Sequence, residues 1–149
     1  MLKIGSTAPD FALPDQNGKT VKLSDLLATS NVVIFFYPKD NTTGCTMQSC
    51  SFRDNYDGFA NKNTKIIGIS SDSNDSHNNF AKSHNLPFSL LSDVNGKVRK
   101  AYQVGRTFGL LPGRATFVID KSGIVRFAIS SQFQIQRHID DTLNFVQSL

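Results

Sequence analysis

A run of five apolar residues, Val-Val-Ile-Phe-Phe at positions 32–36, constrains the fold of this 149-residue chain more than any other feature. β-Branched and aromatic side chains favour a strand, and a strand without a polar position is buried on both faces. Such a strand suits the centre of a sheet that helices cover on both sides. A second run, Ile-Ile-Gly-Ile at residues 66–69, predicts another buried strand. Together the two runs favour a layered α/β fold.

The pattern along the rest of the chain extends this prediction. In a helix expected over residues 45–60, Phe52, Tyr56 and Phe59 recur at helical spacing and face the core. The order strand, helix, strand, helix, hairpin, helix predicts one thioredoxin-like domain over residues 1–149, with a central mixed β-sheet covered by helices on both faces. The other expected elements are a strand end and turn at 10–19, a short strand and a capped helical turn at 21–27, helices at 72–84, 97–102 and 135–146, an extended piece at 88–91, and a hairpin at 115–129 with its turn at 121–123.

Charge and hydropathy exclude several classes of function. The net charge is +4, but the lysines and arginines are spread along the chain, so we expect a diffuse positive surface and no nucleic-acid partner. Such a surface could help to attract an acidic partner protein. No apolar stretch approaches the length of a membrane span, and the N-terminus lacks the apolar region of a signal peptide. We therefore expect a cytoplasmic protein, or a protein of the plastid stroma or lumen if a transit peptide has been removed.

The two cysteines, Cys45 and Cys50, are the candidate reactive groups. In a reducing compartment such cysteines are more often catalytic or sensing than structural. Cys45 is expected in the first turn of a helix, where free N–H groups and the helix dipole favour a thiolate over a thiol. Because the thiolate is the reactive form, this placement predicts redox or nucleophilic chemistry.

Other cysteine chemistries fit the spacing less well. A disulfide reductase would need Cys-x-x-Cys, whereas four residues separate Cys45 from Cys50. A phosphatase would need an arginine six residues after the cysteine, and a structural zinc site would need four ligands. The three histidines, His77, His84 and His138, are interpreted as surface or helix-face residues. We expect no metal and no cofactor.

Taken singly, the residues around Cys45 have simpler interpretations. Thr42 suits a helix cap, Pro38 a strand end and Arg114 a solvated surface charge, and Cys50 could be a small core residue. Together, Pro38, Thr42 and Cys45 reproduce the Pro-x-x-x-Thr-x-x-Cys motif of peroxiredoxins. The longer strings at 36–54 and 113–120 resemble the peroxiredoxin Q group, also called bacterioferritin-comigratory proteins. The string at 108–114 is similar to the cyanobacterial and plastid branch, and the resemblance runs nearly from end to end.

This resemblance implies a thioredoxin-dependent thiol peroxidase that acts on hydrogen peroxide and organic hydroperoxides in antioxidant defence. Cys45 would be peroxidatic, forming a sulfenic acid, and Cys50 would resolve it as an intramolecular disulfide that thioredoxin reduces. Pro38 would shape the loop and exclude water, and the protein would be a monomer without metal, haem or flavin. Gln48 stands where many relatives carry glutamate. The alternative from a different class is a redox sensor or chaperone-like binding module on the same fold.

A lowered thiol pKa alone does not make a cysteine react rapidly with peroxide. Lowering a thiol pKa from about 8.5 to about 5.5 raises the thiolate fraction at pH 7 roughly 30-fold. The same shift costs roughly 20-fold in intrinsic nucleophilicity, so the two effects nearly cancel. The site must therefore stabilise the transition state, for which we expect the Thr42 hydroxyl, the Arg114 guanidinium and the backbone N–H groups of residues 44 and 45.

Overall fold

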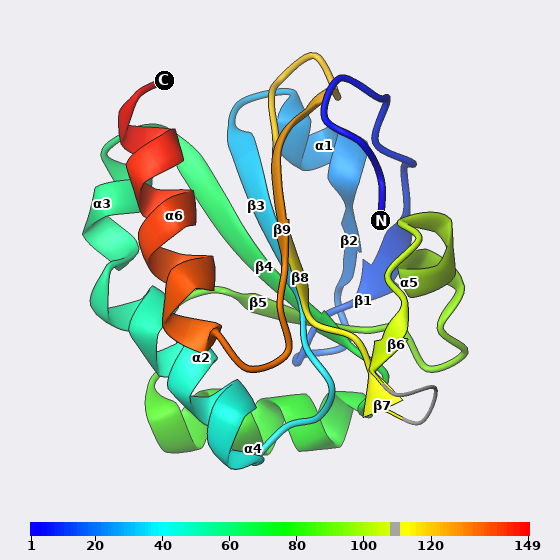
Figure 1. The fold of residues 1–149 in the computed structure, drawn as a ribbon. Helices are drawn as coiled ribbons and strands as arrows, with labels where there is room; N and C mark the ends of the chain where they lie inside the picture. Colours follow the sequence, from blue (N-terminus) through cyan, green and yellow to red (C-terminus); the bar gives the residue numbers. More distant parts are fainter. Residues whose placement is uncertain (108–110) are drawn as a thin grey trace.

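A computed structural model describes residues 1–107 and 111–149 and is drawn in Figure 1. Its main sheet has five strands in the order β5-β4-β3-β8-β9. The central strand β3 (Asn31–Phe36) runs parallel to β4 (Thr64–Ser70) and antiparallel to β8 (Ala115–Ile119). At the two edges, β5 (Ser89–Ser92) is parallel to β4, and β9 (Val125–Ser130) is antiparallel to β8. The predicted mixed sheet with the 32–36 strand at its centre is confirmed.

Helices cover both faces of this sheet, as the two-sided burial of β3 requires (Figure 1). On one face, Val33 and Phe35 pack among residues of α2 (Thr43–Asp54), α3 (Tyr56–Ala60), α4 (Asn74–His84) and α6 (Ile135–Gln147). On the other face, Val32, Ile34 and Phe36 pack with α1 (Leu23–Leu27), α5 (Lys97–Ala101) and the N-terminal segment. Two small hairpins, β1 (Ala12–Pro14) with β2 (Thr20–Lys22) and β6 (Arg106–Thr107) with β7 (Leu111–Pro112), complete the described elements.

Two expected helices differ in detail from the sequence prediction. The helix expected over residues 45–60 is two helices, since α2 ends at Asp54 and α3 begins at Tyr56. The Asn55 side-chain amide donates to the Ser51 carbonyl oxygen at 2.8 Å, a bond that competes with continued helix. The expected cap of α1 is also different: Asp10 Oδ1 accepts from the Ser24 backbone N–H at 3.0 Å, so the cap comes from another segment.

The sequence did not predict the β6–β7 pair. Residues 108–110, which contribute to the resemblance at 108–114, lie outside the described residues. Among the residues that the structure describes, no helix has the length and apolar character needed to cross a membrane.

Candidate active site

The loop from β3 to α2 and the first turn of α2 carry three of the five predicted site residues, Pro38, Thr42 and Cys45. Thr42 is the N-cap residue of α2, with extended backbone (φ −83°, ψ 153°), and Cys45 is the third residue of the helix. The first bond of the helix runs from the Thr46 N–H to the Thr42 carbonyl oxygen at 2.9 Å. The N–H groups of residues 43–45 therefore have no acceptor within the helix and point toward its N-terminal end.

Arg114 reaches the same place from the neighbouring strand of the sheet. It directly precedes β8, whose first residue Ala115 pairs with Phe36 at the end of β3. Arg114 is 4% exposed, and its Nη2 lies 3.4 Å from Cys45 Sγ. The simpler interpretation of Arg114 as a solvated surface charge is therefore wrong. The antiparallel pairing of β3 and β8 brings its permanent positive charge against the Cys45 sulfur.

A second guanidinium nitrogen of Arg114, Nη1, donates to Gln48 Oε1. Gln48 is fully buried one helical turn beyond Cys45, and its Nε2 has no hydrogen-bond partner among the described residues. A glutamate at this position would add a carboxylate to the guanidinium. The neutral Gln48 amide does not compensate the charge of Arg114, but its hydrogen bond still orients the guanidinium group.

The Thr42 hydroxyl donates to the Lys39 carbonyl oxygen at 2.9 Å and makes no side-chain cap of α2. Its proton is therefore used within the loop and is not donated to Cys45 in this arrangement. The oxygen keeps lone pairs that can accept from the O–H of a bound peroxide.

A pocket of about 340 Å³ opens over these groups. Cys45 lies at its base, only 1% exposed, and Phe133 at its rim is 75% exposed. The lining consists of Pro38, Lys39, Thr42, Gly44, Cys45, Arg114, Gln132, Phe133 and Ile135. From the sequence, we did not predict that Gln132, Phe133 and Ile135 line the site, although a phenylalanine between two glutamines was a signal. Another cavity, of about 330 Å³, lies at the opposite end of β8 beside Asp10 and Lys121 and contains no cysteine.

Cys50 is half-buried on α2, and both cysteines are free thiols. On one regular helix, residues five apart have Cα atoms roughly 8.5–9 Å apart. A disulfide needs Cα atoms within about 7 Å and side chains that face one another. Cys45 and Cys50 therefore share a helix without being able to bond in this conformation.

Arg99, which lies on α5 and is 9% exposed, supports the backbone on both sides of the site. Its Nη2 donates to the Tyr37 carbonyl oxygen at 3.0 Å, and its Nη1 donates to the Gly113 carbonyl oxygen at 2.6 Å. These two residues directly precede Pro38 and Arg114. One side chain thus ties together the two backbone segments that deliver the site.

Two histidines correct the sequence interpretation, because His77 and His138 are fully buried. His84 is half-buried, with its ring 5.1 Å from that of Phe80, and agrees with a helix-face position. A signal was present for His77, since residues 77, 80, 81 and 84 follow helical spacing and face the core. Buried polar rings need partners for both nitrogens, and both histidines have them.

His138 supports the segment that lines the pocket. Its Nε2 donates to the Ser131 carbonyl oxygen at 2.7 Å, so its Nδ1 accepts from the Thr116 hydroxyl at 2.8 Å. Burial lowers the pKa of His138 to about 4, and the nearby charge of Arg114 acts in the same direction. The ring is therefore neutral at pH 7 and anchors the residue before Gln132.

This lowered pKa predicts a loss of stability in mild acid. In the unfolded chain His138 has an ordinary pKa of about 6.5, so it binds a proton below that pH, whereas in the folded protein it stays neutral down to about pH 4. The free energy of unfolding therefore falls as the pH falls from about 6.5 towards 4. We expect the free energy of unfolding to drop by about 2 kcal/mol more in the wild type than in His138→Gln between pH 7 and pH 5. Urea unfolding at the two pH values measures this, with His84→Gln as the control. Equal pH dependence in wild type and His138→Gln would contradict the prediction.

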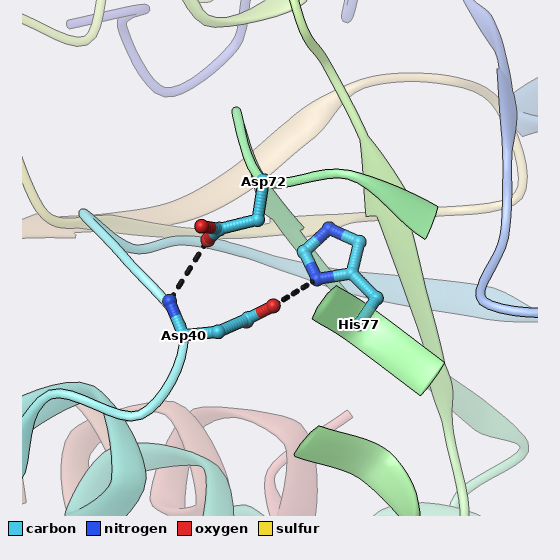
Figure 2. Close-up of side chains that lie close together, drawn as sticks. All are labelled: Asp40, Asp72 and His77. Carbon is cyan, nitrogen blue, oxygen red and sulfur yellow. Dashed lines mark hydrogen bonds and ion pairs between the residues drawn. The ribbon is translucent and has the colours of Figure 1, made fainter. Parts of the chain in front are cut away.

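Asp40, within the loop, lies close to Asp72 and His77, as Figure 2 shows, and the three side chains could be taken for a metal site. His77 Nδ1 and Asp40 Oδ2 are only 2.7 Å apart. Two ligands of one tetrahedral zinc ion, each about 2.1 Å from the metal, lie roughly 3.4 Å apart. The two side chains are hydrogen-bonded to each other and are not arranged around a cation.

The fold and the site define the class of protein: a thioredoxin-like domain with a buried cysteine held by an arginine at a helix N-terminus. The chain matches the AhpC/TSA family over residues 4–128 and belongs to that family. It is 51% identical over 146 residues to the chloroplastic peroxiredoxin Q of Sedum lineare, covering 97% of this chain and 78% of the relative. It is 50% identical over 145 residues to that of Arabidopsis thaliana, covering 97% and 67%.

Solved structures of similar proteins support the same family and fold. Peroxidoxin BcpB of Mycobacterium tuberculosis has a TM-score of 0.93 and 39% identity, covering 100% of this chain and 99% of the other. Peroxiredoxin Q of Xanthomonas campestris has a TM-score of 0.86 and 29% identity, covering 99% and 96%. The predictions of a thioredoxin-like fold, a peroxiredoxin Q relationship and a thiol-peroxidase enzyme are confirmed by these matches.

Proposed function

We propose that this chain reduces hydroperoxides with Cys45 as the reacting sulfur, Cys50 as the resolving thiol and thioredoxin as the electron donor. The observation that supports this most strongly is the 3.4 Å contact between Arg114 Nη2 and Cys45 Sγ at the base of the pocket. The N–H groups of residues 44 and 45 add two further donors from the start of α2.

In the first step the Cys45 thiolate attacks the terminal oxygen of the peroxide. The S–O bond forms while the O–O bond breaks, so the sulfur is oxidised to sulfenic acid and the peroxide is reduced. The leaving oxygen takes up a proton and departs as water or an alcohol. Arg114 and the helix N–H groups face the negative charge that develops on the oxygens, and Thr42 accepts from the peroxide O–H.

In the second step the sulfur of Cys50 attacks the Cys45 sulfenic acid. The S–S bond forms, the S–O bond breaks, and the released hydroxyl group leaves as water with the thiol proton. A dithiol protein then exchanges with this disulfide and returns both cysteines to the thiol form. Thioredoxin is the donor that we propose, because the peroxiredoxin resemblance implies it.

The pocket also supports a substrate class. Pro38, Phe133 and Ile135 contribute apolar surface around Cys45, which suits the alkyl group of an organic hydroperoxide. A Xanthomonas campestris bacterioferritin comigratory protein, with a TM-score of 0.86 and 28% identity, is described by its alkyl peroxide reduction activity. We propose alkyl hydroperoxides beside hydrogen peroxide as substrates, and a monomeric single-domain protein of the cytoplasm or the plastid.

A coupled assay tests the proposal. Purified protein is mixed with thioredoxin, thioredoxin reductase and NADPH, and NADPH loss is followed after addition of hydrogen peroxide or an alkyl hydroperoxide. Sustained turnover, with the disulfide identified by intact mass, supports the proposal. A redox sensor on the same fold would be oxidised once and would not cycle, and that outcome would overturn the enzymatic proposal.

Replacing Cys50 separates the two chemical steps. We expect Cys50→Ser to consume one equivalent of peroxide at the wild-type rate and then stop as a sulfenic acid, because no second thiol remains. Excess peroxide then converts Cys45 to sulfinic acid. Intact mass after one and after many equivalents measures both stages, and multiple turnovers in this variant would exclude Cys50 as the resolving thiol.

Disulfide formation should unwind the start of α2, because the two Cα atoms are too far apart on a regular helix. We expect the amides of residues 46–50, which are hydrogen-bonded within the helix, to exchange hydrogen much faster in the disulfide form than in the reduced form, while those of β3 stay protected. Hydrogen exchange with mass spectrometry compares the two forms. Unchanged protection of α2, with the disulfide confirmed by mass, would contradict the unwinding.

A further inference from the structure

The hydrogen-bonded pair of Asp40 and His77 has no part in the chemistry described so far, yet it is the most deeply buried ionisable pair near the loop (Figure 2). Asp40 lies between Pro38 and Thr42, and His77 lies on α4. Their side chains are 1% and 0% exposed, and His77 Nδ1 is 2.7 Å from Asp40 Oδ2. The pair therefore connects the peroxide-binding loop to a helix that carries none of the reacting groups.

The hydrogen bonds require one shared proton in this pair. His77 Nε2 lies 3.0 Å from the Leu91 carbonyl oxygen, which can only accept, so Nε2 carries a hydrogen. A 2.7 Å contact between Nδ1 and a carboxyl oxygen then needs a second proton, on either the ring or the carboxyl group. The pair has no net charge in either case, and its bond is present as long as that proton is.

Other groups complete the attachment of Asp40. The Tyr37 hydroxyl donates to Asp40 Oδ1 at 2.6 Å, and the Ser76 hydroxyl donates to Oδ2 at 2.9 Å. The backbone N–H of Asp40 donates to Asp72 Oδ2 at 2.8 Å. The main chain and the side chain of Asp40 are thus fixed to Tyr37, directly after β3, to α4 and to the segment that follows β4. The next residue, Asn41, has left-handed backbone with φ of 61°.

We propose that Asp40 and His77 are positioning residues for the reaction with peroxide. Their shared-proton bond holds the loop so that Thr42 and the start of α2 face the pocket. It also marks the point at which the unwinding of α2 stops, because the chain is anchored at Asp40 and free to rearrange after Asn41. This inference rests on the proposed role of Cys45 and goes beyond it by assigning two residues that never touch the substrate.

Burial of the pair supports a positioning role over a role in stability. Removing two ionisable groups from water costs about as much as their attraction returns, so such pairs contribute little net stability. What they add is a defined geometry, since each of the three groups around Asp40 fixes one direction of its carboxyl group. A wrongly placed loop would displace the Thr42 hydroxyl, which accepts from the peroxide, and the N–H donors at the start of α2. Small displacements of such groups lower the reaction rate strongly.

Two substitutions at position 77 separate the hydrogen bond from simple packing. The amide nitrogen of asparagine is two bonds from Cβ, like Nδ1, so His77→Asn can still donate to Asp40 but loses Leu91. The amide nitrogen of glutamine is three bonds from Cβ, like Nε2, so His77→Gln can still donate to Leu91 but loses Asp40. Asparagine also leaves the larger void, so packing alone favours glutamine.

We expect His77→Gln to lower the second-order rate constant of Cys45 oxidation by about tenfold, and His77→Asn to stay within about threefold of wild type. Rapid-mixing oxidation with hydrogen peroxide, read out by mass, measures this, with His84→Gln on the same helix as the control. Disulfide formation from the sulfenic acid should not be slowed in either variant. Equal losses, the reverse order, or wild-type rates in both variants would overturn the proposal.

A second matched pair keeps the test decisive if a position-77 variant does not fold. In Asp40→Asn the amide can donate to a neutral His77 ring, whereas the similarly sized Asp40→Leu makes no hydrogen bond. We expect a loss within about threefold for Asp40→Asn and about tenfold for Asp40→Leu. Similar rates in these two variants would contradict the proposal.

Hydrogen exchange gives a readout independent of turnover. The Asp40 amide should stay protected in the wild-type disulfide form while the amides of residues 46–50 exchange, and it should lose protection in reduced His77→Gln. An Asp40 amide that exchanges together with α2 would show that the anchor is elsewhere. Failure of the proposed function would look different, since Cys45→Ser would then keep its activity whatever the state of position 77.

Discussion

Cys45→Ser is expected to abolish peroxide turnover, since a serine hydroxyl is not ionised at neutral pH and cannot replace a thiolate as the nucleophile. Cys50, the only other cysteine, lies five residues further along α2, away from the helix start. In contrast to Cys45, its side chain does not line the pocket that contains Arg114. Loss of Cys45 should therefore leave no residue that can do the chemistry.

The coupled peroxide assay measures this loss, and we expect activity at the level of the assay without enzyme. Near-native thermal unfolding should accompany it, because replacing sulfur by oxygen changes the buried volume little. Cys50→Ser is the matched control in a single-turnover measurement, because it should still consume one equivalent of peroxide whereas Cys45→Ser should consume none. Wild-type turnover in Cys45→Ser would mean that another residue carries the reaction.

Arg114→Ala is expected to slow Cys45 oxidation by about a hundredfold, because one preorganised donor to a developing charge is worth a few kcal/mol. The same change leaves Gln48 without its partner and removes the positive charge beside the sulfur. We expect more than tenfold for Thr42→Val, which removes both the acceptor for the peroxide O–H and the bond to Lys39.

Rapid-mixing kinetics of the first oxidation measure both effects without interference from the reductant. Arg126→Ala is the control for loss of a positive charge, since its side chain is 48% exposed and does not line the pocket. Thr42→Ser keeps the hydroxyl and should stay close to wild type. Near wild-type rates in Arg114→Ala and Thr42→Val would refute transition-state stabilisation by these groups and leave the reactivity to other features of the helix start.

The sequence was informative wherever structure depends on near neighbours. The apolar run at residues 32–36 has only one low-energy placement, between two layers of helices, and the structure has it there. The order strand, proline, threonine, cysteine similarly predicted that Cys45 lies at the start of a helix, because helix capping depends on residues close in sequence. The family motif added the roles of these residues, and the five-residue spacing was enough to show that a disulfide must disturb α2.

Contacts between distant segments were decided only by the tertiary structure. Arg114 meets Cys45 because β8 pairs with β3, and residues 132–135 reach the pocket because α6 packs on α2, neither of which leaves a local pattern. The sequence pattern assigned His77 and His138 to the surface or to a helix face, because hydropathy assigns a polar ring to water. Burial of such a ring is stable only where the fold supplies partners for both nitrogens, and those partners, Asp40 with Leu91 and Thr116 with Ser131, come from segments that the chain brings together only on folding.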